Sequence, residues 1–232
     1  MTFSGSRFGL ALQMTIEIPL FPLRTVLFPG MPLPLRVFEE RYKALTREIL
    51  QTGGVFGVLL IKEGEEIGGS AVPYTVGSTA LIEECQELDE GRFVISARGD
   101  RRFRLVRLLP PRPFPCGEIV YLDDDRELPA PRLQTALETV NAMFPAYFRL
   151  ALSLSDQWAR SLKLPRDPHA LVNFLGPLLP TEDEVKQRLL ETESAADRVA
   201  LLAEILDELL ERTREEVIDH HRRKFDGFGA KN

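Results

Sequence analysis

The sequence predicts an α+β fold, with β-strands in the first half of the chain and helices in the second. Short apolar runs rich in β-branched residues recur at a spacing of about 8–12 residues, which is typical of a small barrel or sandwich. These runs stop at an acidic stretch, residues 123–125. Beyond it, apolar residues recur with the 3.6-residue period of a helix.

The opening segment, residues 16–50, is the most informative part of the chain. Its apolar run is interrupted by five prolines, at positions 19, 22, 29, 32 and 34. Proline cannot donate a hydrogen bond to a β-ladder and fixes its own φ, so the run is expected to form two short strands separated by rigid turns. A helix follows, because Phe38, Tyr42, Leu45 and Ile49 share one helical face before Gly53-Gly54 ends the pattern.

Further strands are predicted by β-branched runs and by turn residues between them. We expect strands at 55–62, 74–84, 93–97, 101–109 and 117–122. Gly77 is interpreted as the site of a bulge. A hairpin turn is predicted at 89–92, and a second turn at Gly99-Asp100. Two strands from the opening segment bring the total to six or seven.

The second half predicts a bundle of four or five helices. One covers 133–148, where Pro145 should kink or end it, and another covers 155–164. Asp167 is predicted to cap a helix over 169–174 that Gly176-Pro177 stops, and Thr181 with Glu184 to form a capping box. Ser194 begins the longest helix. The predicted organisation is an extension at 1–13, a β-rich domain at 14–125, a helical bundle at 126–226 and a frayed tail at 227–232.

Composition describes an ordinary soluble globular protein. The 232 residues are 44% hydrophobic and 28% charged, with a formal net charge of −6. This acidic balance argues against a general binder of phosphate backbones. Two distant cysteines indicate a reducing compartment, and no run approaches the ~20 apolar residues of a membrane span. We expect a cytoplasmic protein whose physiological start is Met1 or Met14, with residues 1–13 contributing nothing to the fold.

The ordered set of segments resembles the amino-terminal, substrate-binding domain of the Lon family of ATP-dependent proteases. The resemblance rests on the proline-broken start with FEERY, on VFGVLLIK, VGSTALIEE and GEIVYLDDD, and on the helical stretch from TEDEV to AEIL, and it covers about residues 15–215. It implies a PUA-like β pseudo-barrel followed by a C-terminal helical bundle. It also implies non-catalytic binding of unfolded or degradation-tagged polypeptides, with an adaptor or regulator role in protein quality control and a separate protease as a candidate partner. A full Lon protease continues into ATPase and peptidase domains, so we expect a standalone member.

No motif in the sequence indicates catalysis. The phosphate-binding pattern G-x-x-x-x-G-K-[ST] is missing, and no serine lies in G-x-S-x-G or S-x-x-K. Glu216 and His220 have the i, i+4 spacing of a metal pair, but a solvated helix end explains them better. We therefore expect no enzymatic activity, no cofactor and no metal.

A cluster of arginines supplies an alternative function. Five of them fall within ten residues: Arg98, Arg101, Arg102, Arg104 and Arg107. PUA-like folds include RNA-binding modules, so this arginine-rich hairpin is a candidate RNA surface. However, Arg102 and Arg104 alternate with apolar residues, as solvent-facing residues of a half-buried strand do, and acidic residues precede them in the chain. Ion pairing across strands is therefore the preferred interpretation.

The apolar residues beside the opening prolines are the candidate polypeptide-binding site: Phe21, Leu23, Phe28, Met31 and Leu33. Rigid turns can keep apolar side chains exposed, and exposed apolar surface marks interaction sites. We expect Phe28 or Met31 to be partly solvent-accessible. A small-molecule pocket between barrel and bundle is a third hypothesis. The sequence indicates neither the client nor the oligomeric state.

Overall fold

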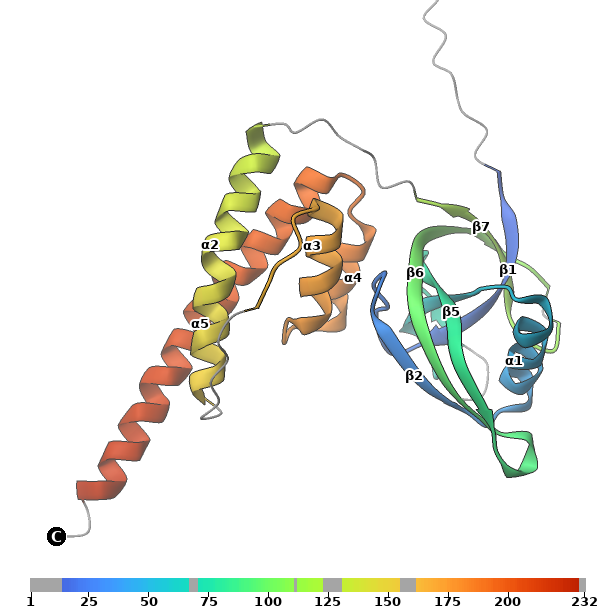
Figure 1. Cartoon of the computed structure of the whole chain (residues 1–232), viewed down its shortest axis with the longest axis horizontal. Helices are drawn as coiled ribbons and strands as arrows, with labels where there is room; N and C mark the ends of the chain where they lie inside the picture. The colour runs from blue at the N-terminus through green and yellow to red at the C-terminus, as the bar shows by residue number, and fades with distance from the viewer. Residues whose placement is uncertain (1–13, 67–70, 111, 123–130, 155–161, 230–232) are drawn as a thin grey trace, which may run out of the picture. The chain divides into compact units, whose positions relative to one another are not determined.

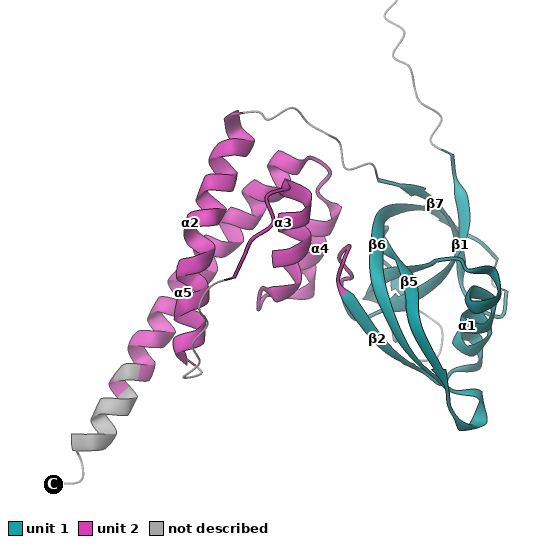
Figure 2. Cartoon of the chain, viewed as in Figure 1, with its two compact units in different colours: residues 1–25, 32–122 teal, residues 26–31, 123–232 magenta. Residues whose placement is uncertain are grey.

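The computed structural model describes residues 14–66, 71–110, 112–122, 131–154 and 162–229, and these form two compact units (Figure 2). The barrel unit contains the chain up to Thr25 and Pro32–Leu122. The helical unit contains Val26–Met31 and the chain from Asp123 onwards. The predicted extension at 1–13 lies outside the described residues. The α+β fold class is confirmed.

The barrel unit is built from seven strands, five of which close into a ring (Figure 1). The ring runs β1–β7–β6–β5–β3, and β3 returns to β1 through a parallel pairing of Leu20 with Gly57. Two further strands lie outside the ring: β2 pairs with β6, and the short β4 pairs with β3. The bounds are β1 Ile16–Leu23, β2 Pro32–Val37, β3 Phe56–Glu63, β4 Val72–Pro73, β5 Val76–Glu87, β6 Phe93–Leu108 and β7 Cys116–Tyr121.

Glycines allow the ring to close around large side chains. One buried cluster contains Ile18, Leu20, Leu59, Phe103 and Ile119. A Cβ on Gly57 would lie 2.8 Å from the Phe103 ring, and a Cβ on Gly77 only 2.1 Å from the carbonyl oxygen of Val58. The absence of a side chain at these positions lets neighbouring strands and core side chains approach closely. Gly77 therefore marks a close backbone approach, and the register shift in β5 follows it, after Ser78.

The helix of the barrel unit, α1, spans Glu40–Thr52 and ends as the sequence predicts. Gly53 adopts the left-handed conformation (φ 66°), and its N–H donates to the carbonyl of Ile49. Three of the four residues expected on its buried face are buried, namely Tyr42, Leu45 and Ile49. Phe38 is not, because the helix begins only at Glu40 and Phe38 precedes it.

The helical unit consists of α2 Pro131–Leu154, α3 Pro168–Leu175, α4 Asp183–Glu191 and α5 Ala195–Gly229, with α2 packed along α5 (Figure 1). Asp167 caps α3 as predicted, with its side chain accepting a 2.8 Å bond from the N–H of Ala170. One stripe of α5 is buried, and it consists of Val199, Leu202, Leu206, Leu209 and Thr213. Arg198 is also fully buried, and it donates to Asn173 of α3 and to the carbonyl of Leu189 of α4.

Several local predictions are wrong. Gly99-Asp100 does not form a turn, since β6 runs unbroken through it. Thr181 does not cap α4, which begins after Glu182 without a side-chain cap. Helix α2 does not end at Pro145, which was one of the two outcomes predicted there, but continues to Leu154. Residues 227–229, expected to fray, are helical. The helix predicted at 155–164 lies mostly outside the described residues, and 162–164 is not helical.

The turn between β1 and β2 belongs to the helical unit, and of the two residues expected to be accessible, Phe28 is not. Phe28 is fully buried, as are Val26 and Leu27. The Phe28 ring lies against Gly176, where an added Cβ would be 2.8 Å from ring atom Cζ. Phe28 is buried because Gly176 leaves room for an aromatic ring. Met31 is partly accessible, as predicted.

Candidate functional site

A groove of about 460 Å³ lies in the barrel unit and is the candidate functional site. It is lined by the end of β1, the second half of β2, the start of α1 and the loop after β3. Its lining residues are Phe21, Leu23, Arg24, Pro34, Leu35, Arg36, Val37, Phe38, Glu39, Tyr42, Glu65 and Glu66. All of them belong to the barrel unit, so the groove is formed within one compact body.

The groove follows the open edge of β2. On one side β2 pairs with β6, from Pro32 opposite Arg98 to Val37 opposite Phe93. Consecutive residues from both faces of β2, Pro34 to Val37, line the groove, and no residue of β6 does, so we place the groove beside the other edge of β2. Among the described residues, no strand pairs with that side. Unpaired backbone groups of β2 therefore border the groove.

Aromatic side chains form the apolar part of the groove. The rings of Phe21 and Tyr42 are stacked, with centroids 3.8 Å apart and planes 8° apart. Burial raises the pKa of Tyr42 to about 12, so its hydroxyl stays protonated at neutral pH. Phe38 is 54% exposed, a large exposure for an aromatic residue lining a groove. An apolar contact from a partner would remove this ring from water.

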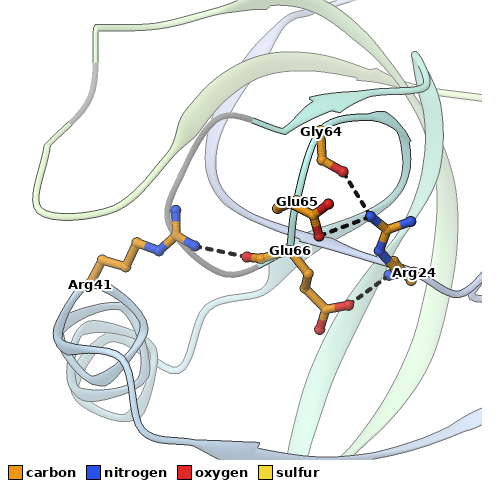
Figure 3. Close-up of polar contacts among 5 residues, drawn as sticks. All are labelled: Arg24, Arg41, Gly64, Glu65 and Glu66. Carbon is orange, nitrogen blue, oxygen red and sulfur yellow. Dashed lines mark hydrogen bonds and ion pairs between the residues drawn. The ribbon is translucent and has the colours of Figure 1, made fainter.

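One wall of the groove is held by a polar network around Glu66 (Figure 3). The backbone N–H of Arg24 donates to the Glu66 carboxylate at 3.2 Å, and the Arg24 guanidinium donates to the Gly64 carbonyl at 2.8 Å and to Glu65 at 3.2 Å. On the other side, Arg41 of α1 donates to the Glu66 carbonyl at 3.0 Å. Residues 64–66 are thus tied to both β1 and α1.

Arg36 differs from Arg24, the other arginine that lines the groove. Its side chain is exposed on β2, and it makes no hydrogen bond or ion pair within the described part of the chain. Arg24 is already engaged by Glu65. Arg36 is therefore the arginine of this groove that is available to pair with an anionic group on a partner.

The structure brings together only part of the predicted polypeptide-binding set. Phe21 and Leu23 line the groove, although each is only 5–6% exposed. Leu33 is buried in β2, while Phe28 and Met31 belong to the helical unit. Sequence reasoning missed Phe38, which it placed on the buried face of the helix. Recognising Glu39 as the residue before the helix would have placed Phe38 outside it.

The five arginines of the RNA hypothesis lie along one strand, β6, rather than around a hairpin, and contacts within the protein engage them. Arg98 pairs with Glu83 at 2.5 Å, and Arg107 pairs with Glu118. Arg101 stacks over the ring of Tyr121, 3.9 Å from its centroid. Arg104 is half-buried and also has an interaction partner. The strand therefore lacks the row of free cations that RNA binding would use.

The prediction that Arg102 faces solvent is wrong, since only 2% of it is exposed. The cause is a bulge. Ser78 pairs with Arg102 and Ala80 pairs with Gly99, so Thr79 alone faces two residues of β6. The N–H of Arg101 donates to the Thr79 hydroxyl at 3.2 Å. The bulge shifts the alternation of β6 and places Arg102 on the same face as the buried Gly99.

Neither a metal site nor a membrane span is found in the part of the chain that the structure describes. No three His, Cys, Asp or Glu side chains there are grouped to hold a metal ion. No helix within the described ranges is both long enough and apolar enough to cross a bilayer.

Comparison with known proteins identifies the family. A family model described as the ATP-dependent protease La (LON) substrate-binding domain matches residues 17–208. The chain belongs to this family. The Lon protease of Anaeromyxobacter dehalogenans (strain 2CP-C) is 25% identical over 192 residues, and that of Porphyromonas gingivalis is 28% identical over 196 residues. These matches cover 82% and 80% of this chain but only 23% of each relative. The chain thus spans about a quarter of the length of these relatives.

Solved structures of Lon N-terminal domains share the fold. The Lon N-terminal domain protein from Xanthomonas campestris is 30% identical, with a TM-score of 0.59 over 81% of this chain and 96% of that one. The N-terminal domain of the Mycobacterium avium complex Lon protease is 19% identical, with a TM-score of 0.62 over 83% and 98%. The resemblance stated from the sequence is therefore confirmed. The family match covers the substrate-binding domain and not the ATPase or peptidase domains.

Proposed function

We propose that this protein binds exposed segments of unfolded polypeptides through the groove beside β2, and that it serves proteolysis as a cytoplasmic adaptor or regulator. The observation that carries the proposal is the combination, in one groove, of an exposed aromatic side chain and an open strand edge. Membership of the Lon substrate-binding family supports the same function.

The chemistry of the groove suits such clients. Unfolded chains expose apolar side chains and unpaired backbone groups but share no sequence. Phe38, which is 54% exposed, presents apolar surface to the apolar side chains of the client, and the buried, stacked pair of Phe21 and Tyr42 lies in the groove lining. The open edge of β2 presents hydrogen-bonding groups to the unpaired backbone groups of the client. No nucleophile or general base is needed for this binding.

Replacement of Phe38 tests the proposal. Phe38→Ser should weaken binding of a reduced, carboxymethylated (permanently unfolded) protein by about 1–2 kcal/mol, since an aromatic anchor of this kind contributes strongly to binding. Its effect on stability should be small, because the ring is already 54% exposed. Fluorescence anisotropy of the labelled client measures the affinity.

A matched control is Val106→Ser in β6, where the native side chain is 52% exposed and does not line the groove. This variant should bind the client as the wild type does. Equal affinity of the Phe38 variant and the wild type, or an equal loss in both variants, would contradict the proposal.

A further inference from the structure

We propose that the client enters the groove as an extended strand added to the open edge of β2, with a carboxylate opposite Arg36 and apolar residues on either side. This inference rests on the proposed function and specifies the conformation and pattern of the client. It follows from three features of β2: its backbone donors and acceptors, the alternation of its side chains and the charge of Arg36.

The prolines of β2 determine which backbone groups face the groove. Residues of an antiparallel strand alternately direct their N–H and C=O toward one neighbour and then toward the other side. Pro32 and Pro34 have no N–H, so they suit positions whose donors would point away from β6. Leu33 and Leu35 then bond to β6, while Pro32, Pro34 and Arg36 direct their carbonyls to the open edge.

This edge has three acceptors and a single donor, the N–H of Arg36. A client residue opposite Arg36 can both donate to its carbonyl and accept from its N–H. A client residue opposite Pro34 can only donate. Prolines on an edge oppose permanent strand pairing. The edge of β2 therefore offers a donor and an acceptor at Arg36 but only acceptors at Pro32 and Pro34. Because fewer hydrogen bonds can form than at an ordinary strand edge, this edge suits a client that must be released.

The side chains of β2 fix the pattern of the client. Pro34 and Arg36 are exposed on one face of the strand, whereas Val37 is buried and Leu35 half-buried on the other. A residue directly opposite Arg36 shares its face, so a carboxylate there forms a cross-strand ion pair. The residues before and after it share the face of Leu35 and Val37, two apolar residues that line the groove together with Phe21 and Tyr42. The expected pattern is apolar–acidic–apolar.

The availability of Arg36 is what favours an acidic rather than a basic client residue. The side chains of Glu39, Glu65 and Glu66 also line the groove. However, Glu39 pairs with Arg41 at 3.0 Å, while Glu65 and Glu66 bond to Arg24. The carboxylates are thus engaged by the protein and Arg36 is not, within the described residues.

The test uses capped synthetic peptides and needs no variant for its first step. A fluorescein-labelled peptide alternating Val and Glu should bind the wild type more tightly than the same peptide with Lys for Glu, by at least about fivefold. Single N-methyl groups placed along the Val–Glu peptide should weaken binding at alternate positions only, because every second N–H faces β2. Uniform or absent sensitivity to N-methylation would overturn strand addition.

Three variants separate charge from backbone. Arg36→Gln keeps the N–H and should abolish the preference for Glu over Lys while retaining binding. Arg36→Pro also removes the donor and should weaken both peptides by about a further three- to tenfold, as expected for one hydrogen bond. Pro34→Ala adds a donor to the open edge and should strengthen binding about threefold. Circular dichroism confirms that each variant is folded.

Strand addition and polypeptide binding are refuted by different results. If Arg36→Pro and Arg36→Gln bind alike and Pro34→Ala changes nothing, the client does not add as a strand, although Phe38→Ser still weakens binding of the carboxymethylated protein. If the wild type does not bind that unfolded protein at all, the proposed function is wrong and strand addition falls with it.

Discussion

The contact between Phe28 and Gly176 predicts that Gly176→Ala destabilises the wild type but not a variant in which Phe28 is replaced by leucine. Gly176 has helical backbone angles (φ −48°, ψ −48°), so alanine fits its backbone and should gain up to about 1 kcal/mol in helix propensity. However, the new Cβ would lie 2.8 and 2.9 Å from atoms Cζ and Cε1 of the Phe28 ring. Overpacking of this kind costs about 1–3 kcal/mol.

Gly176→Ala should therefore destabilise the wild type by about 1–2 kcal/mol. In a Phe28→Leu background the far edge of the ring is gone, and the same change should be neutral or stabilising. Urea unfolding followed by far-ultraviolet circular dichroism of the four proteins gives the coupling energy, which we expect to be about 1–3 kcal/mol. Phe28→Ala alone should cost about 3–5 kcal/mol, as for any fully buried phenylalanine.

An equal loss of stability from Gly176→Ala in both backgrounds would refute this reasoning. It would show that the new methyl group does not clash with the Phe28 ring. A destabilisation of Phe28→Ala below about 1 kcal/mol would likewise show that the turn between β1 and β2 is not docked in the helical unit.

Three further predictions concern two glycines, an exposed arginine and a buried tyrosine. Gly77→Ala should lower the free energy of unfolding by about 3 kcal/mol or prevent folding, because its Cβ would lie 2.1 Å from a carbonyl oxygen of β3. Gly30 has a φ of 82° but open space around it, so Gly30→Ala should lower the free energy of unfolding by only about 1–2 kcal/mol in the same urea assay. Arg98→Gln should change the free energy of unfolding by less than about 1 kcal/mol, because its pair with Glu83 is exposed, and filter-binding should show no change in RNA affinity. Burial raises the pKa of Tyr42 from 10.0 to about 12, so the native state binds the hydroxyl proton more strongly than the unfolded state does. The contribution of this protonated hydroxyl to stability should be complete below pH 10.0 and be lost as the pH rises to about 12. Ultraviolet titration of tyrosinate and thermal melts at each pH will measure both effects.

The elements governed by local chemistry were predictable from the sequence. The strand β3, the helix α1 with its glycine end and the cap of α3 follow from residues only a few positions apart. The groove was predictable only in part, since Phe21 and Leu23 were identified as candidates but the exposed Phe38 was not. Whether an apolar residue next to a helix start is buried depends on the residue at which the helix begins, and apolar periodicity leaves this uncertain by a few positions.

Features that depend on distant residues were not predictable. The burial of Phe28 requires Gly176, which the sequence showed only as a helix stop. The burial of Arg102 requires the bulge opposite Thr79, and alternation read along β6 alone gives the opposite face. In both cases a residue of another element determines whether the side chain is buried. The pattern of residues within the segment itself therefore cannot predict its burial.

The membership of Val26–Met31 in the helical unit has a consequence for synthesis of the chain. Phe28 leaves the ribosome about 150 residues before Gly176, and at about 5–20 residues per second this interval lasts about 7–30 seconds. During that time the barrel strands can pair, but the apolar turn between β1 and β2 has nothing to cover it. Nascent chains of this length should therefore be bound by chaperones that recognise apolar segments, and release should follow once α3 has emerged. The last step of folding would then join the turn between β1 and β2 to the end of α3.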